Sequence, residues 1–166
     1  MSQPRSRAGR PATAVRKPRP ATASSWASSE QVRLQMQRQR TRDTAPEMQL
    51  RRALHAAGLR YRVDTPAVSG LRRRADLVLR PSKVAVFVDG CFWHGCPQHG
   101  GPTPHANPAY WIQKMRRNRE RDADTDRRLH DAGWLVLRIW EHEDMSEAAG
   151  AVALAVRERL AHRSDS

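Results

Sequence analysis

Long apolar segments, cysteines and acidic residues are all scarce in this sequence of 166 residues. No segment approaches the roughly 18 consecutive apolar residues of a membrane-spanning helix, and the mean hydropathy is −0.78, so we expect no membrane partner. Two cysteines are too few for a disulfide-based scaffold. The 17 Asp and Glu residues are outnumbered by 30 Lys and Arg residues, which leaves a formal net charge of +13. Such a surplus indicates nucleic acid or another anionic surface as the partner.

Six of the basic residues lie in residues 1–29, a segment without any acid. The segment is rich in Pro, Ala, Ser and Thr, so it buries too little apolar surface to offset the loss of chain entropy. We therefore predict a disordered basic tail that makes weak DNA contacts, with an Arg-rich transit peptide as the alternative. The rest of the chain is predicted to form a basic arm (30–43), a folded domain (44–162) and a C-terminal tail (163–166).

Hydrophobic periodicity in the folded domain predicts an alternation of helices and strands. Thr44, Pro46 and Glu47 form a capping-box pattern that begins one helix. Residues 83–89 are almost all apolar, which predicts a central strand buried on both faces. The predicted helices span residues 44–57, 107–131 and 147–162, and the predicted strands span residues 61–64, 75–79, 83–89 and 134–140. This order predicts an α/β domain in which helices flank a mixed sheet.

A Gly- and Pro-rich loop over residues 90–106 contains both cysteines and three histidines. Cys91, Cys96 and His99 have a spacing typical of metal ligands, and His142 follows the last predicted strand. Two thiolates and two imidazoles suit a closed, tetrahedral, structural zinc site. A Cys91–Cys96 disulfide and a set of unrelated residues are the alternatives, and the first is disfavoured without a secretion signal.

Acidic residues occur at the ends of neighbouring predicted strands. Asp76 opens one strand, Asp89 ends the next, and Glu47 begins a helix. If they converge, their oxygens suit Mg²⁺; the alternative is that they only end strands and cap a helix. His94 could be a metal ligand, a surface residue or a general base, because histidine titrates near neutral pH. Asp122 on the long helix could orient it.

Several aromatic residues lie beside the polar loop instead of within a periodic apolar face. Phe92, Trp93 and Trp111 could stack on bases or wedge between them, although Trp111 could equally pack against its own helix. Trp134 and Trp140 belong to a predicted strand and are expected in the core.

Six short stretches of the sequence occur together in one enzyme family. They are TRDTAPE (41–47), RADLV (74–78), VFVDGCFWHGC (86–96), YWIQKM (110–115), NRERD (118–122) and GWLVL with IWE (133–141). With these motifs the chain resembles the very short patch repair (Vsr) endonucleases over about residues 36–142, and the VFVDGCFWHGC block is highly specific.

The resemblance implies a restriction-endonuclease-like fold of the PD-(D/E)xK type. It also implies Mg²⁺-dependent nicking of one strand of double-stranded DNA beside a T·G mismatch, which arises when 5-methylcytosine deaminates. Such an enzyme would act as a monomer in a bacterial-type cytoplasm, associated with the nucleoid. A functional link to a cytosine-5 DNA methyltransferase and to mismatch-repair proteins is implied as well.

The resemblance also assigns roles to individual residues. Asp76 and the backbone carbonyl of Val88 would bind Mg²⁺, His94 would be the general base, Asp122 would orient it, and Glu47 would assist. The implied structural zinc ligands are Cys91, Cys96, His99 and His142. The implied DNA contacts are the wedge of Phe92, Trp93 and Trp111 and the arm with Met36, Arg40 and Arg42.

The sequence departs from the family pattern at several positions. Ala75 stands before Asp76 where many members have proline, and Cys91 occupies the position of the usual lysine two residues after Asp89. Asp89 itself stands where some members have histidine, and its contact with Mg²⁺ stays open. His99 requires a one-residue shift in the loop, so His105 is a competing zinc ligand. A zinc-stabilised DNA-binding module without nuclease activity, and a nicking enzyme of the same fold with another lesion or sequence preference, are the alternative functions.

Overall fold

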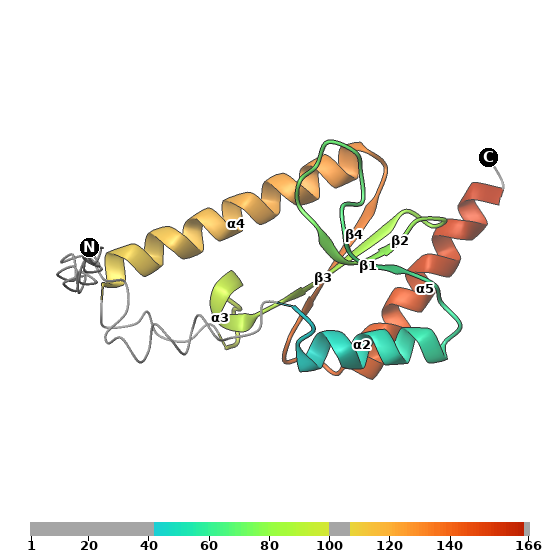
Figure 1. The fold of residues 1–166 in the computed structure, drawn as a ribbon, viewed down its shortest axis with the longest axis horizontal. Helices are drawn as coiled ribbons and strands as arrows, with labels where there is room; N and C mark the ends of the chain where they lie inside the picture. The colour runs from blue at the N-terminus through green and yellow to red at the C-terminus, as the bar shows by residue number, and fades with distance from the viewer. Residues whose placement is uncertain (1–41, 100–106, 165–166) are drawn as a thin grey trace, which may run out of the picture.

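The computed structural model of the chain describes residues 42–99 and 107–164, which Figure 1 draws in colour. The predicted tail over residues 1–29, most of the arm with Met36 and Arg40, and His105 lie outside the described residues. Within the described residues, no helix is both long enough and apolar enough to cross a membrane.

Four strands form one mixed sheet in the order β1-β2-β3-β4. β1 (Arg62–Thr65), β2 (Ala75–Leu79) and β3 (Val84–Asp89) are joined by antiparallel pairing, and β4 (Leu135–Trp140) pairs with β3 in parallel. β3 therefore has a partner on both sides, and its first three residues are fully buried. The hairpin of β2 and β3 sets the beginning of β2 beside the end of β3.

Helices cover both faces of the sheet (Figure 1). α2 (Ala45–Ala56) and α5 (Met145–Ser164) pack together on one face, and α4 (Pro108–Asp131) lies on the other. The larger core lies under α2 and α5, and its fully buried members include Leu50, Leu54, Val84, Val86 and Val152. A smaller core under α4 includes Val78, Ala85, Leu129 and Trp134. Burying one such aliphatic side chain is worth roughly 1.5–3 kcal/mol, so the two cores hold the helices in place.

A short helical turn, α3 (Cys91–His94), begins the segment that was predicted to be a loop. Gly90 precedes it, and Gly95 ends it in the left-handed conformation, with φ of 65°. A side chain at residue 95 would also collide with the guanidinium of Arg119. Four residues are too few to carry a helical hydrophobic period, so the sequence pattern does not reveal this turn.

The predicted α/β class and the order of the remaining elements are confirmed. β2 has the predicted bounds, the other strands begin one residue later than predicted, and α5 is longer at both ends. α5 begins early because the carboxylate of Asp144 accepts hydrogen bonds from the backbone N–H groups of Ser146 and Glu147, at 2.7 and 2.9 Å. Trp134 is buried as expected, whereas Trp140 is half-buried.

Candidate active site and metal centre

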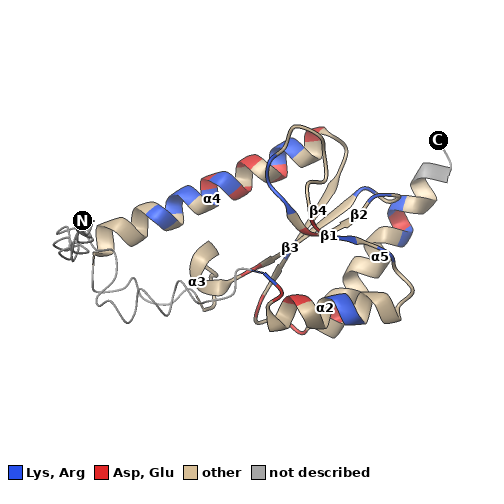
Figure 2. Cartoon of the chain, in the orientation of Figure 1, with Lys and Arg blue, Asp and Glu red and all other residues tan. Residues whose placement is uncertain are grey.

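Several elements converge at the end of β3. Antiparallel pairing brings Asp76 of β2 beside Val88 of β3, and the two residues are joined by a hydrogen bond. α3 follows β3 directly and packs against α4, which extends past the sheet above it (Figure 1). Figure 2 shows that α4 carries alternating acidic and basic residues over the middle of its length. Residues far apart in the sequence thus meet at one edge of the domain.

Asp76 is a half-buried carboxylate among other acids. Its Oδ2 accepts a hydrogen bond from the backbone N–H of Val88 at 2.7 Å. Burial raises the pKa of Asp76 to about 6; the Val88 hydrogen bond opposes this, and the nearby charges of Glu47 and Asp89 add to it. A bound divalent cation would offset the cost of burying a charged carboxylate and the repulsion between the acids, so this group of oxygens suits a hard metal ion.

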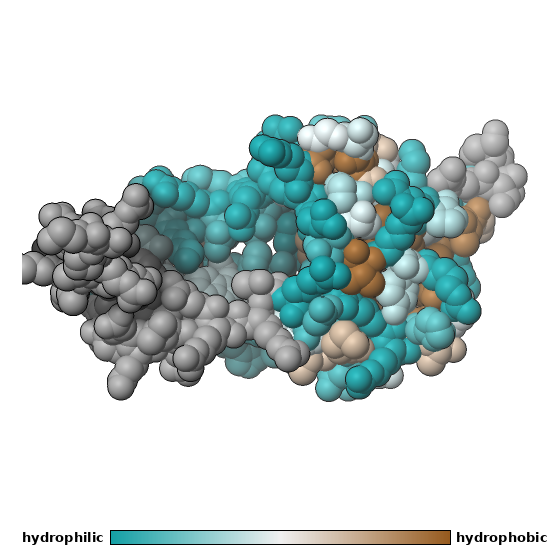
Figure 3. Space-filling model, in the orientation of Figure 1, coloured by the Kyte–Doolittle hydropathy of each residue, from teal (hydrophilic) through white to brown (hydrophobic). Residues whose placement is uncertain are grey.

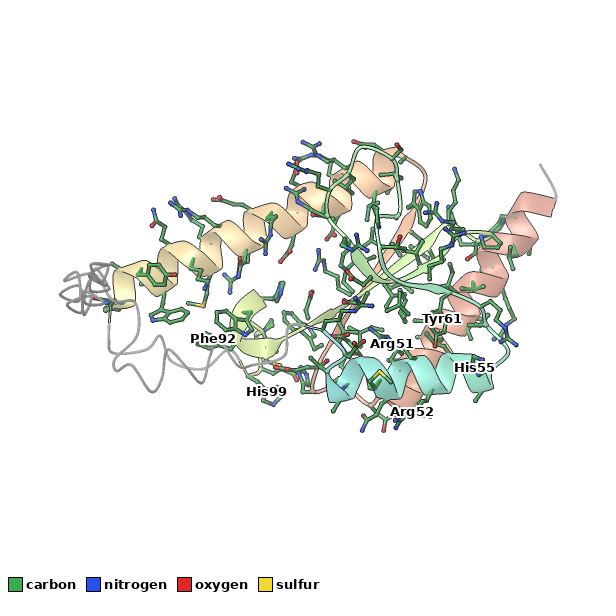
Figure 4. All side chains as sticks on the ribbon, viewed as in Figure 1. Arg51, Arg52, His55, Tyr61, Phe92 and His99 are labelled. Carbon is green, nitrogen blue, oxygen red and sulfur yellow. The ribbon has the colours of Figure 1, made fainter. Side chains whose placement is uncertain are left out.

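Glu47 projects from the first turn of α2 and is 6% exposed. Its carboxylate accepts hydrogen bonds from the backbone N–H of Asp43, the hydroxyl of Thr44 and the guanidinium of Arg51, all within 3.0 Å. Thr44 is the N-cap residue as predicted, but its hydroxyl bonds the glutamate instead of a backbone N–H. Arg51 points from α2 toward the sheet, whereas Arg52 points away from it (Figure 4). The Arg51–Glu47 ion pair thus fixes the carboxylate near Asp76.

His94, the last residue of α3, is held by residues of α4. Its Nδ1 lies 2.7 Å from Oδ2 of Asp122. The backbone around it is also bound: the Asn118 amide donates to the carbonyl of Trp93 at 2.9 Å, and Arg119 donates to the carbonyl of Gly95 at 3.1 Å. A proton on Nδ1 shared with a carboxylate leaves Nε2 with its lone pair, which is the arrangement of a general base.

Arg138 of β4 is a site residue that the sequence did not suggest. Its guanidinium donates to both oxygens of Asp89, at 3.0 and 2.8 Å, and to Asp126 of α4 at 2.9 Å. Burial alone would lower the pKa of Arg138, but the hydrogen bonds with Asp126 and Asp89 outweigh it and hold that pKa above its usual range. The sequence feature that could have revealed Arg138 is a single arginine inside an apolar strand. A guanidinium that is removed from water requires acidic partners.

The four predicted zinc ligands form one cluster. The ligand atoms of Cys91, Cys96, His99 and His142 all lie within 4.8 Å of one another. The sulfur of Cys91 is 3.0 Å from Nδ1 of His142, and both cysteines are free thiols, so the disulfide alternative is wrong. Burial and the neighbouring Cys96 raise the pKa of Cys91 to about 11, a penalty that a bound cation would reverse. The two cysteines are buried, whereas His99, labelled in Figure 4, and His142 are exposed.

The aromatic residues of α3 and α4 form a second cluster. Phe92, Trp93 and Trp111 have ring centroids 5.0 to 5.9 Å apart, in edge or tilted arrangements. Trp111 is only 2% exposed, whereas Phe92 and Trp93 are half-exposed on α3. The ammonium of Lys114 lies 4.7 Å from the centroid of Trp93. In this conformation Trp111 therefore supports the two α3 residues, of which Phe92 is labelled in Figure 4.

Of the three arm residues that are implied to contact DNA, Arg42 alone lies within the described part of the chain. Its side chain is 57% exposed and pairs with Asp64 at 3.1 Å. The view in Figure 3 shows mostly hydrophilic residues along α4. A charged, water-exposed surface of this kind is compatible with a phosphate backbone.

Comparison with known proteins places the chain in a family. A family model described as DNA mismatch endonuclease Vsr matches residues 27–99. The type II nicking enzyme V.NaeI of Lentzea aerocolonigenes is 49% identical over 119 residues, which cover 70% of this chain and 71% of that relative. The chain belongs to the Vsr family.

Other Vsr-type relatives cover the same region. The type II nicking enzyme V.NmeDIP of Neisseria meningitidis serogroup C is 37% identical over 134 residues, or 78% of this chain and 88% of the relative. The DNA mismatch endonuclease Vsr of Escherichia coli (strain K12) is 37% identical over 101 residues, or 61% of this chain and 63% of the relative. As a member of the Vsr family, the chain is a DNA-nicking hydrolase and not merely a DNA-binding module.

Proposed function

We propose that this Vsr-family enzyme nicks one strand of double-stranded DNA beside a T·G mismatch, in a reaction that requires Mg²⁺. The observation that carries the proposal is the His94–Asp122 pair, 2.7 Å apart, at the same strand end as the half-buried carboxylate of Asp76. An oriented base beside a metal-binding carboxylate is what the hydrolysis of a phosphodiester needs. We further propose that the sheet and its helices are a restriction-endonuclease-like fold.

The residues around Asp76 fit a magnesium ion. Asp76 and the backbone carbonyl of Val88 would hold it, and a bound cation would offset the burial and the nearby acids that raise the pKa of Asp76. When bound, Mg²⁺ would supply Lewis acidity for the charge that develops on the phosphate and on the leaving oxygen. The ion pair with Arg51 at 2.9 Å holds the carboxylate of Glu47 in place. From there Glu47 would assist by acting on Asp76 through its charge.

The protein residues divide the remaining steps among themselves. His94 removes a proton from the attacking water through Nε2, because its Nδ1 proton is shared with Asp122. Asp122 fixes the ring and stabilises the positive charge that the ring gains. Asn118 and Arg119 hold the backbone of the α3 turn through the carbonyls of Trp93 and Gly95, so the ring cannot drift from the reacting phosphate.

A structural zinc ion fits the second cluster. Ligand atoms of a tetrahedral zinc site lie roughly 3.3–3.8 Å apart, and Cys91, Cys96, His99 and His142 offer two sulfurs and two nitrogens within 4.8 Å. Such a set has no open position for substrate, so zinc would have a structural role. It would join the segment after β3 to the end of β4.

Selectivity for a mismatch is assigned to the aromatic cluster. Phe92 and Trp93 would enter the base stack from the major groove, supported by Trp111. The arm with Met36, Arg40 and Arg42 would lie in the minor groove. Unstacking a base step costs a few kcal/mol, and less where the pair is already weakened. That difference in cost would favour a mismatched site over paired DNA.

The proposed activity also has consequences for oligomeric state, location and partners. Nicking one strand needs one active site, so we propose that the enzyme acts as a monomer on nucleoid DNA in the bacterial cytoplasm. We propose a functional link to a cytosine-5 DNA methyltransferase, whose product deaminates to thymine, and to mismatch-repair proteins. The proposed division of the chain is a basic tail (1–29), a DNA-binding arm (30–43), the endonuclease domain (44–162) and a short tail (163–166).

A nicking enzyme with another lesion or sequence preference is the second candidate. It is favoured by the relatives from Lentzea aerocolonigenes and Neisseria meningitidis, which are named type II nicking enzymes. Both candidates use the same residues and differ only in the DNA that is cut.

One nicking assay separates the two candidates. The purified full chain is incubated with labelled duplexes that carry each single mismatch in varied flanking sequences, with Mg²⁺ or with EDTA. We expect a nick in one strand beside T·G only, and only with Mg²⁺. Cleavage that prefers another mismatch would favour the second candidate, and cleavage in EDTA would contradict the role of the metal.

A further inference from the structure

His94 faces two carboxylates that compete for one nitrogen. Its Nδ1 is 2.7 Å from Asp122 and 3.6 Å from Oδ1 of Asp89. Asp122 approaches from α4, whereas Asp89 approaches from the end of β3, so the two acids would draw the imidazole in different directions. A general base works only when its free nitrogen points at the water that it deprotonates. The choice between the two acids therefore matters for nicking.

Arg138 binds one of the two competing acids. It donates to both oxygens of Asp89, at 3.0 and 2.8 Å, whereas its distance to Asp122 is 3.6 Å. Nη1 of Arg138 alone spans both Asp89 oxygens, while Nε and Nη2 bind Asp126 in a bidentate pair that fixes the plane of the guanidinium. Asp89 thus has both oxygens occupied, and Oδ2 of Asp122 stays with His94.

The fold places Arg138 so that it can do this. Phe87 of β3 lies opposite Arg138 in the parallel pairing with β4, and Asp89 follows two residues later on the same face of β3. The guanidinium carbon lies 4.8 Å from the centroid of the Phe87 ring. Asp126 of α4 binds the other edge of the guanidinium, at 2.9 to 3.2 Å. The cation is therefore held from β3 and from α4 at once.

We propose that Arg138 is a positioning residue for the nicking reaction. By occupying Asp89, it keeps that carboxylate away from His94 and from the cation at Asp76, so that Asp122 alone orients His94. The inference rests on the proposed role of His94 as the base. It also assigns Asp89 a partner other than the metal ion.

Without Arg138, three acids would face one another without their common cation. Asp89 is 5% exposed, so it would seek a new partner inside the site and not in water. Nδ1 of His94 already lies 3.6 Å from Oδ1 of Asp89, and the charge of Asp89 already acts on Asp76, where the metal ion would bind. Either contact would misplace the base or the metal, while the DNA-binding surface on α3 and α4 would be unchanged.

The test is a double-mutant comparison by single-turnover nicking of the preferred duplex. Arg138→Met should slow nicking roughly 10- to 100-fold, since an oriented general base contributes about 10²- to 10⁴-fold, while the Kd for DNA in EDTA changes less than about twofold. Arg138→Met with Asp89→Asn should recover to within about threefold of the wild type, because a neutral amide competes poorly for the imidazolium. Arg157→Met is the control, since Arg157 is exposed on α5, on the opposite face of the sheet from α4.

The outcomes separate this inference from the proposed function. Nicking by Arg138→Met at the wild-type rate, or a double variant as slow as the single one, would overturn the positioning role. A loss of nicking that thermal melting matches with an equal loss of folded protein would overturn it as well, because Asp89→Asn would then rescue only the fold by removing an unpaired buried charge. If thermal melting shows that Arg138→Met is unfolded, Arg138→Lys with and without Asp89→Asn makes the same comparison. His94→Ala at the wild-type rate would instead overturn the proposed function itself.

Discussion

Two groups of potential metal ligands lie on either side of Gly90, and they are built differently. The oxygen group before it contains half-buried Asp76 and buried Asp89, near the guanidinium groups of Arg51 and Arg138. The sulfur and nitrogen group after it draws two thiols and two imidazoles together from α3, the following loop and the end of β4. In both groups burial raises the pKa of an acid, to about 6 for Asp76 and to about 11 for Cys91.

The difference shows how the two sites would depend on their metals. In the oxygen group, arginines already offset much of the negative charge, so the fold can exist before a cation binds. In the sulfur and nitrogen group, a bound metal ion would link α3 to the segment after β4. We therefore expect an exchangeable Mg²⁺ in the first group and a permanent Zn²⁺ in the second.

Zinc removal should have the largest effect. We expect about one zinc ion per purified chain, and chelation or Cys96→Ser should unfold the region around α3, because a structural zinc ion contributes roughly 10–16 kcal/mol in small zinc domains. Metal analysis and circular dichroism melting measure this. A folded, active preparation that contains no zinc would contradict the assignment.

Removing the carboxylate of Asp76 should abolish nicking without unfolding the protein. Asp76→Ala should slow nicking by at least about a thousandfold, since a catalytic metal is worth several kcal/mol, while DNA binding stays near the wild-type level. Single-turnover rates and binding titrations are the measurements. Asp131→Ala, at the exposed end of α4, is the matched control and should nick normally.

The α3 turn between the two sites should carry mismatch preference. Trp93→Ala should reduce the preference for mismatched over matched DNA roughly 5- to 100-fold, because aromatic stacking on a base is worth about 1–3 kcal/mol. Leu154→Ala, an exposed position on α5, should leave the preference unchanged. Equal losses of affinity for both duplexes would show that Trp93 is a general contact.

Mg²⁺ binding at Asp76 should depend on pH, with a smaller effect than the substitutions above. With the pKa of Asp76 at about 6, lowering the pH from 7 to 5 should weaken Mg²⁺ binding about tenfold, because the protonated carboxyl cannot bind the ion. The raised pKa also means that the metal-free protein loses stability as the pH rises from about 4 through 6. Mg²⁺ should therefore raise the melting temperature more at pH 7 than at pH 5; an equal rise at both would contradict the role of Asp76.

Much of this architecture could be predicted because its signals are local. The apolar run of β3, the periodic face of α2 and the Pro and Gly residues at helix ends are properties of neighbouring residues, and the elements appear where those residues predict them. The motif that contains Cys91 and His94 likewise predicted a metal-ligand cluster and a histidine beside Asp122. The α3 turn was missed because its four residues depend on Gly90, Gly95 and contacts from α4.

The sequence by itself determined the α/β class, the family and the kinds of ligand that are present, because these depend on residue identity and spacing. Only the tertiary structure decided which charges meet. Arg138 and Asp89 are 49 residues apart, and the parallel pairing of β3 with β4 brings them together where burial makes each require the other. The burial of Trp111 beneath Phe92 and Trp93 arose in the same way, since side chains from separate helices compete for one protected space.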